Sequence, residues 1–176
     1  KDFFESREML MAISILKAID NPYDDISLCS AMMSPVFLFT PSDLAEIRSH
    51  KDARKTELYS SVKLAAKLGN QKCAEFLKAL GDLRNLAAGQ SVDALLSLLY
   101  DRYGLYWFVG ALKGGEERMN NLDMLRYYAR QFENNGYKGL GAFLRFIDKI
   151  QKGNEKLKGA QSLTENHNAV RIMTAH

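Results

Sequence analysis

Apolar residues recur at every third or fourth position along most of this 176-residue chain, and no other feature of the sequence constrains its fold as strongly. This spacing matches the turn of an α-helix, so it predicts a series of helices with apolar faces. Proline occurs only three times, and glycines or proline-containing turns separate the periodic stretches. The sequence therefore predicts an all-α fold, an irregular bundle of about seven to nine helices followed by a short C-terminal strand.

The first predicted helix, at residues 8–19, is apolar nearly all round. A helix with so little polar surface is expected to be buried on several sides, as a connector between two bodies would be. The proline of Asn21-Pro22 ends this helix, because a proline excludes the residue before it from the α region. If one of the domains that this helix would connect is absent, the chain is expected to self-associate through exposed apolar groups, namely Phe3, Phe4, Met9, Ile13 or the terminal strand.

Capping residues predict where several helices begin and end. Asp24 or Asp25 fits the N-cap of a short second helix. Thr40 fits the N-cap of the next helix, and Asp43 completes a capping box with it. Gly89 is expected to end a later helix in the left-handed conformation that glycine adopts readily.

The composition is that of an ordinary globular domain, with 47% hydrophobic and 26% charged residues. No apolar run reaches the roughly 18 residues that a membrane span needs, so no membrane partner is predicted. Cys29 and Cys73 lie in apolar helical stretches, which favours free thiols in a reducing compartment. We therefore expect a cytoplasmic protein. The net charge of +3 permits a local patch that binds nucleic acid without requiring one.

The sequence shows no recognisable catalytic constellation. It contains no Gly-x-x-x-x-Gly-Lys-[Ser/Thr] loop for ATP phosphates, and no nucleophile can be placed beside a base on the predicted helices. His50, His167 and His176 share no metal-ligand spacing with one another or with the cysteines. Accordingly, no catalytic residue, metal ligand or bound cofactor is predicted for the chain.

An aromatic run has two possible explanations, and the sequence alone leaves both open. It comprises Tyr100, Tyr103, Tyr106, Trp107 and Phe108. Its partly helical spacing favours packing in the core or between domains. Stacking on nucleic-acid bases is the alternative.

Two clusters of basic residues also have two explanations. The first comprises Lys51, Arg54, Lys55, Lys63, Lys67 and Lys72, and the second comprises Lys149, Lys152, Lys156 and Lys158. Lysines on a solvated helix face are the ordinary explanation. The functional explanation is attraction to DNA phosphates, which would be independent of sequence and strongly salt-dependent.

The segment at 170–176 has the β-branched and apolar residues of a buried strand, yet no partner strand is predicted for it. A lone strand leaves its backbone groups unpaired. The first residue is Lys1 rather than Met, and a helical pattern begins almost at once. Together these features suggest a domain excised from a larger protein.

Several segments, taken in order, resemble one protein family. Residues 19–28 and 33–37 resemble the IDNPxxDIxL…SPxF stretch of AddA-type helicase–nuclease subunits, and residues 39–48 continue that match. Further along, residues 115–122 are similar to the GxxRxANL helix start of AddA and RecB relatives.

Two more segments extend the resemblance toward the end of the chain. Residues 139–147 look like the GLxxFLxxI that follows in the same relatives. Residues 170–176 are similar to VRIMTxHKSKGLEF, which opens motif V of UvrD-like superfamily 1 helicases. The matches span nearly the whole chain. The exception is the stretch from about residue 51 to residue 102, which carries no matching motif beyond its helical character.

The resemblance implies a position inside a motor protein. Residues 1–20 would be a connector helix from the second motor domain, and residues 21–152 the helical insertion called subdomain 2B. Residues 153–169 would be a flexible linker, and residues 170–176 a truncated motor-domain strand. Thr174 and His176 match positions of motif V that approach single-stranded DNA.

The resemblance also implies an activity for a parent protein. That parent would be an ATP-dependent 3′→5′ DNA helicase with an exonuclease domain, using ATP and Mg²⁺. It would act with a second helicase/nuclease subunit in double-strand break repair and recombination. This chain would be a non-catalytic helical part that positions DNA and neighbouring subdomains. The alternatives are a stand-alone helical interaction module and, with least support, an independent enzyme.

Overall fold

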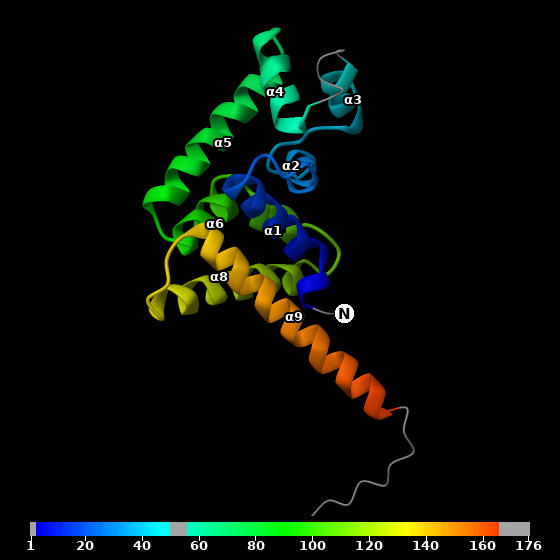
Figure 1. Ribbon diagram of the computed structural model, residues 1–176, viewed down its shortest axis with the longest axis vertical. Coiled ribbons are helices and arrows are strands. Elements are labelled where there is room, and N and C mark those ends of the chain that lie inside the picture. Colours follow the sequence, from blue (N-terminus) through cyan, green and yellow to red (C-terminus); the bar gives the residue numbers. More distant parts are fainter. Residues whose placement is uncertain (1–2, 50–55, 166–176) are drawn as a thin grey trace, which may run out of the picture. The chain divides into compact units, whose positions relative to one another are not determined.

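The computed structural model describes residues 3–49 and 56–165, with side chains described as far as 153, and all of the regular secondary structure in these ranges is helical. Nine α-helices and one 3-10 helix follow one another (Figure 1), and these described ranges contain no strand. Their bounds are η1 Phe3–Glu5, α1 Arg7–Asp20, α2 Asp25–Met32, α3 Pro41–Ser49, α4 Leu58–Lys67, α5 Gln71–Gly89, α6 Val92–Asp101, α7 Leu105–Gly110, α8 Gly115–Asn134 and α9 Leu140–Glu165. This confirms the all-α prediction, whereas the predicted strand at 170–176 lies outside the described residues.

The chain divides into two compact units, residues 1–144 and residues 145–176. The larger unit contains every helix except the later part of α9. Its core is built from aliphatic and aromatic side chains contributed by α1, α2, α4, α5, α6 and α8. No helix in the described part of the chain is both long and apolar enough to cross a membrane.

Helix α1 is the central helix of the larger unit (Figure 1) and packs against α2, α5 and α8. It is buried at eight of its positions, and Phe4, Met9 and Ile13 are covered by other parts of the same unit. The expectation that Phe4, Met9 and Ile13 form an exposed surface for self-association is therefore wrong. Phe3 is half-buried, the terminal strand lies outside the described residues, and self-association itself stays a prediction. The contacts with α2, α5 and α8 account for burial of these apolar positions of α1.

The predicted N-caps are confirmed by hydrogen bonds. The Asp24 carboxylate accepts the backbone N–H groups of Ile26 and Ser27 at the start of α2. At α3, the Asp43 carboxylate accepts the Thr40 N–H at 2.7 Å, and the Thr40 hydroxyl accepts the Asp43 N–H at 3.2 Å. This reciprocal pair is the capping box that the sequence predicted.

The prediction that a helix ends at Gly89 is confirmed, but the predicted left-handed conformation of Gly89 is wrong. Gly89 is the last residue of α5, and Gln90 follows it in an extended conformation with φ −122°. The Gln90 N–H still donates to the Leu86 carbonyl at 2.8 Å. The Val92 N–H then donates to Glu133 Oε1 at 2.6 Å, which holds the turn between α5 and α6 against α8. The turn therefore closes without a left-handed residue.

Helix α9 extends to Glu165, through most of the segment that the resemblance assigned to a linker at 153–169. Residues 153–165 contain no proline and are rich in Lys, Glu, Leu, Ala and Gln, which have high helix propensity. These residues favour continuation of the helix, although Gly153 and Gly159 within the segment do not. The division of the chain into connector, insertion, linker and strand remains a prediction.

Glycine determines how α7 meets α8. Gly104 and Gly114, the residues before the two helices, have φ of +72°. A Cβ atom on Gly115 would lie 2.0 Å from the carbonyl oxygen of Gly110, so only glycine permits this close approach. The six residues of α7 are thus held tightly against the start of α8.

Candidate functional site

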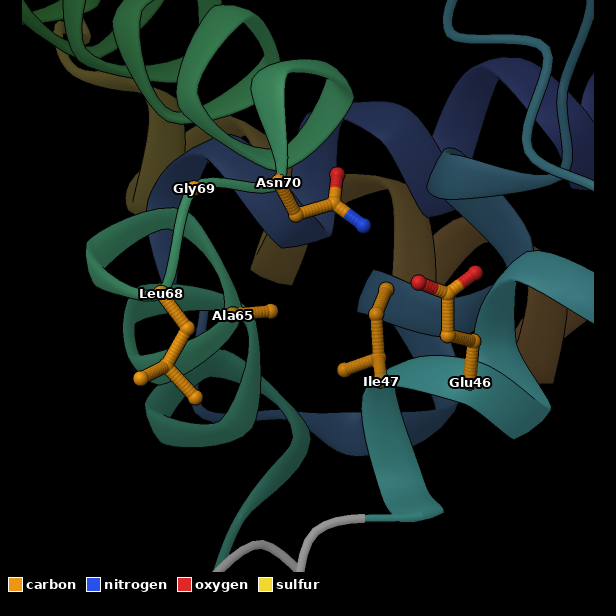
Figure 2. Close-up of a pocket in the computed structure, with 6 residues that line it drawn as sticks. All are labelled: Glu46, Ile47, Ala65, Leu68, Gly69 and Asn70. Carbon is orange, nitrogen blue, oxygen red and sulfur yellow. The ribbon is translucent and has the colours of Figure 1, made fainter.

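A small cavity lies between α3, α4 and the turn that leads into α5 (Figure 2). Its volume is about 220 Å³, and its lining comprises Glu46, Ile47, Ala65, Leu68, Gly69 and Asn70. Figure 2 shows Ile47 and Glu46 of α3 on one side, Ala65 of α4 and Leu68 just after that helix on the other, and Asn70 above them. The Asn70 side chain already caps α5 by accepting the Cys73 N–H at 3.0 Å.

This cavity lacks the chemistry of a catalytic site. Its lining offers one carboxylate and one amide, and it pairs no nucleophile with a base. Cys73 follows closely in the sequence, but burial raises the pKa of its thiol to about 11. Because the thiolate is the reactive form, this cysteine is a packing residue near neutral pH.

A partly buried ion pair joins the two helices α1 and α8. Glu8 is only 3% exposed, and its carboxylate accepts hydrogen bonds from Arg118 Nη1 and Asn121 Nδ2, each at 2.6 Å. Arg118 also donates from Nε to the Lys113 carbonyl at 3.1 Å. Both carboxylate oxygens of Glu8 are therefore engaged by residues more than a hundred positions away in the sequence.

The electrostatics of this pair favour the charged form of Glu8. Burial on its own raises the pKa of Glu8, but the hydrogen bond from Asn121, further hydrogen bonds and the charge of Arg118 outweigh it, so the pKa lies below the ordinary value. A cavity of about 370 Å³ opens beside the pair between the starts of α1 and α8. Sequence reasoning missed this cluster. The available signal was a carboxylate at the start of the mostly apolar stretch of α1, which requires a partner if it is buried.

The predicted phosphate-contacting patch is partly described. Lys149 and Lys152 are exposed on α9, and their three-residue separation places them on the same side of the helix. The helical backbone continues through Lys156 and Lys158, whose side chains are not among those described. Thr174 and His176 also lie outside the described residues, so all six remain predictions as DNA-contacting residues.

The other basic cluster does not form a single patch of unpaired cations. Lys63 Nζ lies 4.6 Å from the ring centre of Tyr59 and 5.5 Å from that of Tyr23. Lys72 Nζ lies 2.7 Å from the Asp43 carboxylate, and this contact, together with the hydrogen bonds from Thr40, lowers the pKa of Asp43 to about 2. Lys67 is exposed, and Lys51, Arg54 and Lys55 lie outside the described residues.

The structure divides the aromatic run into buried and exposed members. Tyr100 is buried, and its hydroxyl donates to the Leu122 carbonyl at 2.8 Å, which confirms the packing explanation for this residue. Tyr106 is half-buried and donates to Asp123 Oδ2 at 2.8 Å. Trp107 and Phe108 instead face solvent. Packing inside this chain therefore does not account for the whole run.

Within the described residues, no group of three or more His, Cys, Asp or Glu side chains is placed to hold a metal ion. The charged groups that do converge there form ion pairs. An example is Asp93, whose carboxylate lies 2.8 Å from Arg126 Nε and 3.2 Å from Arg130 Nε. Such contacts hold α6 against α8.

Comparison with known proteins relates the chain to helicase/nuclease subunits. No protein-family model matches it. It is 40% identical to the AddA subunit of the ATP-dependent helicase/nuclease of Acetivibrio thermocellus and 38% identical to that of Desulforamulus reducens, each over 99% of this chain and 14% of the relative. The AddA subunit of Geobacillus thermodenitrificans is 37% identical, over 99% of this chain and 15% of its own length.

These identities show that the chain is homologous, over nearly its whole length, to one segment of the AddA subunit of ATP-dependent helicase/nucleases. The chain spans about 14% of the length of the curated relatives it matches. This confirms the resemblance to AddA-type subunits at the level of homology. The position of the matched segment among the subdomains of the relatives remains a prediction.

Proposed function

We propose that this chain forms the helical 2B-like segment of an ATP-dependent DNA helicase/nuclease subunit. The observation that carries the proposal is continuous similarity to an AddA subunit over 99% of the chain. An all-helical fold, in which the described ion pairs hold helices together, is consistent with a structural segment of such a protein.

The role proposed for the segment is non-catalytic. In the parent protein it would position DNA and the neighbouring motor domains, while ATP and Mg²⁺ would bind elsewhere in that protein. The parent would unwind DNA in the 3′→5′ direction and degrade it together with a second helicase/nuclease subunit during double-strand break repair. A cytoplasmic location accompanies this proposal.

Within this role, we assign DNA contact to two places. Thr174 and His176 would approach single-stranded DNA at the start of motif V. Lys149, Lys152, Lys156 and Lys158 would attract phosphates, with exposure of the first two as the structural support. Attraction of this kind is independent of the DNA sequence and weakens as the salt concentration rises.

The test combines activity assays with DNA binding by the 176-residue chain. We expect no ATP hydrolysis and no nuclease activity, together with weak DNA binding that falls steeply as salt increases. Lys149→Glu combined with Lys152→Glu should weaken binding and make the salt slope shallower by about one unit per lysine. The matched control is Lys78→Glu with Lys138→Glu, two lysines elsewhere on the surface, which produces the same net charge.

The control separates a local patch from overall charge. If both double variants weakened DNA binding equally, the assignment of phosphate contact to the lysines of α9 would be wrong. ATP hydrolysis or DNA cleavage by the purified chain would contradict the non-catalytic role.

A further inference from the structure

Two tyrosine rings and a lysine form one cluster on the surface, where the turn before α2 meets α4. The rings of Tyr23 and Tyr59 contact each other edge to face, with their centroids 5.2 Å apart. Lys63 Nζ lies over both rings and donates a hydrogen bond to the Tyr23 hydroxyl at 3.3 Å. Side chains from two separate segments of the chain therefore make a continuous aromatic and cationic surface.

The cluster is held in place by contacts within the chain. Pro22 is buried, and the Tyr23 N–H donates to Asn21 Oδ1 at 3.1 Å, which fixes the backbone of the turn. The Tyr23 side chain nevertheless keeps a large free surface, because the residue is 51% exposed. Since Lys63 and Tyr59 already restrict this ring, a planar group that packs on it costs little further side-chain entropy.

The cations of this surface are available to an anion. The Lys63 ammonium has three N–H donors, and the Tyr23 hydroxyl occupies one of them. Lys67 is exposed one helical turn further along the same face of α4. Among the described residues, neither lysine has a carboxylate within ion-pair distance.

The carboxylates that follow Tyr23 in the sequence already have partners. Asp24 caps α2 and accepts a hydrogen bond from the Ser27 hydroxyl at 2.6 Å. Asp25 lies 3.1 Å from Arg48 Nη2, which balances its charge. The two lysines therefore outnumber the one carboxylate that no cation pairs with, and the local charge favours phosphates.

We propose that Tyr23, Lys63 and Lys67 bind single-stranded DNA, with a base stacked on the Tyr23 ring and phosphates beside the two ammonium groups. Sites for single strands combine aromatic rings with cations in this way and tolerate any base sequence. A duplex does not suit the ring, because the faces of paired bases are covered by their neighbours. The inference adds a third place of DNA contact to the proposed function and rests on it, since the segment meets DNA through a parent that acts on DNA.

Photochemical cross-linking of the wild-type chain locates the contact. The probe is a single-stranded oligothymidylate that contains 5-iododeoxyuridine, and mass spectrometry identifies the residue to which it attaches. We expect attachment at Tyr23 to exceed several-fold that at Tyr137, another exposed tyrosine of the surface. Attachment mainly at Tyr137 or at other residues would overturn the proposal, as would none.

Fluorescence anisotropy measures how much the stacked base contributes to binding. Tyr23→Ala should weaken binding of the oligothymidylate about five-fold or more and leave binding of a duplex unchanged. Tyr23→Phe keeps the ring and should bind like the wild type, as should the control Tyr137→Ala. Because these side chains are exposed, the thermal midpoints should not change. Equal affinity of Tyr23→Ala and the wild type for the single strand would contradict stacking.

A charge-matched pair of variants tests the lysines. Lys63→Gln with Lys67→Gln should weaken single-strand binding several-fold more than Lys78→Gln with Lys138→Gln, which removes the same charge elsewhere on the surface. Equal weakening would remove the site on α4. If the wild type binds DNA and the substitutions at this site have no effect, the inference is wrong and the assignment to α9 stands. If the wild type binds no DNA, DNA contact by this chain is wrong as a whole.

Discussion

At the scale of single residues, Glu8 carries the strongest prediction. Glu8→Ala removes both hydrogen-bond acceptors of the pair and leaves Arg118 and Asn121 without their carboxylate. Arg118 is 29% exposed and keeps its hydrogen bond to the Lys113 carbonyl, so its charge stays partly solvated, and we expect the free energy of unfolding to fall by about 1.5 kcal/mol through the lost hydrogen bonds. Urea denaturation of the variant and the wild type measures this difference.

The control for Glu8 is Glu5→Ala, at an exposed carboxylate of η1, which should change stability by less than about 0.5 kcal/mol. The effect of Glu8 also depends on pH. Because its pKa is lowered in the folded chain, its stabilisation is complete above the ordinary value of 4.5 and is lost as pH falls through the lower folded value. The difference between wild type and Glu8→Ala should shrink over that acidic range, and an unchanged difference there would refute the assignment.

At the scale of secondary-structure elements, the junction of α7 and α8 depends on glycine. In Gly115→Ala the new Cβ would collide with the Gly110 carbonyl, so the two helices must move apart. We expect a loss of about 2 kcal/mol in the free energy of unfolding, as for other overpacked sites. Thermal or urea denaturation provides the measurement.

A matched glycine substitution shows whether geometry or helix propensity is responsible. Gly81 lies inside α5, and a Cβ there would meet no atom within 4 Å. Gly81→Ala should therefore stabilise the chain by about 0.7 kcal/mol, because alanine favours helix more than glycine. If both alanine variants changed stability in the same direction, close packing at Gly115 would not be the reason.

At the scale of the whole molecule, stability should be unevenly distributed over the helices. Helix α1 is buried at eight positions and is surrounded by α2, α5 and α8, whereas α3 buries only Ile47. Backbone amides of α1 should exchange with solvent only when the larger unit unfolds. Those of α3 should exchange through local opening, at a free energy about 2 kcal/mol lower. Native-state hydrogen exchange measures both, and equal protection of the two helices would contradict this hierarchy.

The sequence by itself determined the helices and many of their beginnings. Amphipathic spacing and the caps at Asp24 and Thr40 involve residues a few positions apart, so the chain encodes them locally. It misjudged the conformation of Gly89, where residue type was a weaker guide than the surrounding contacts.

Only the tertiary structure decided which apolar surfaces are covered. Spacing shows that α1 is apolar, but not that other helices of the same unit surround it, because those contacts join residues far apart in the chain. The same holds for the partner of Glu8, which lies 110 positions away, and for the exposure of Trp107 beside the buried Leu105. Periodicity identifies a helix, and packing across the molecule then determines what each of its faces meets.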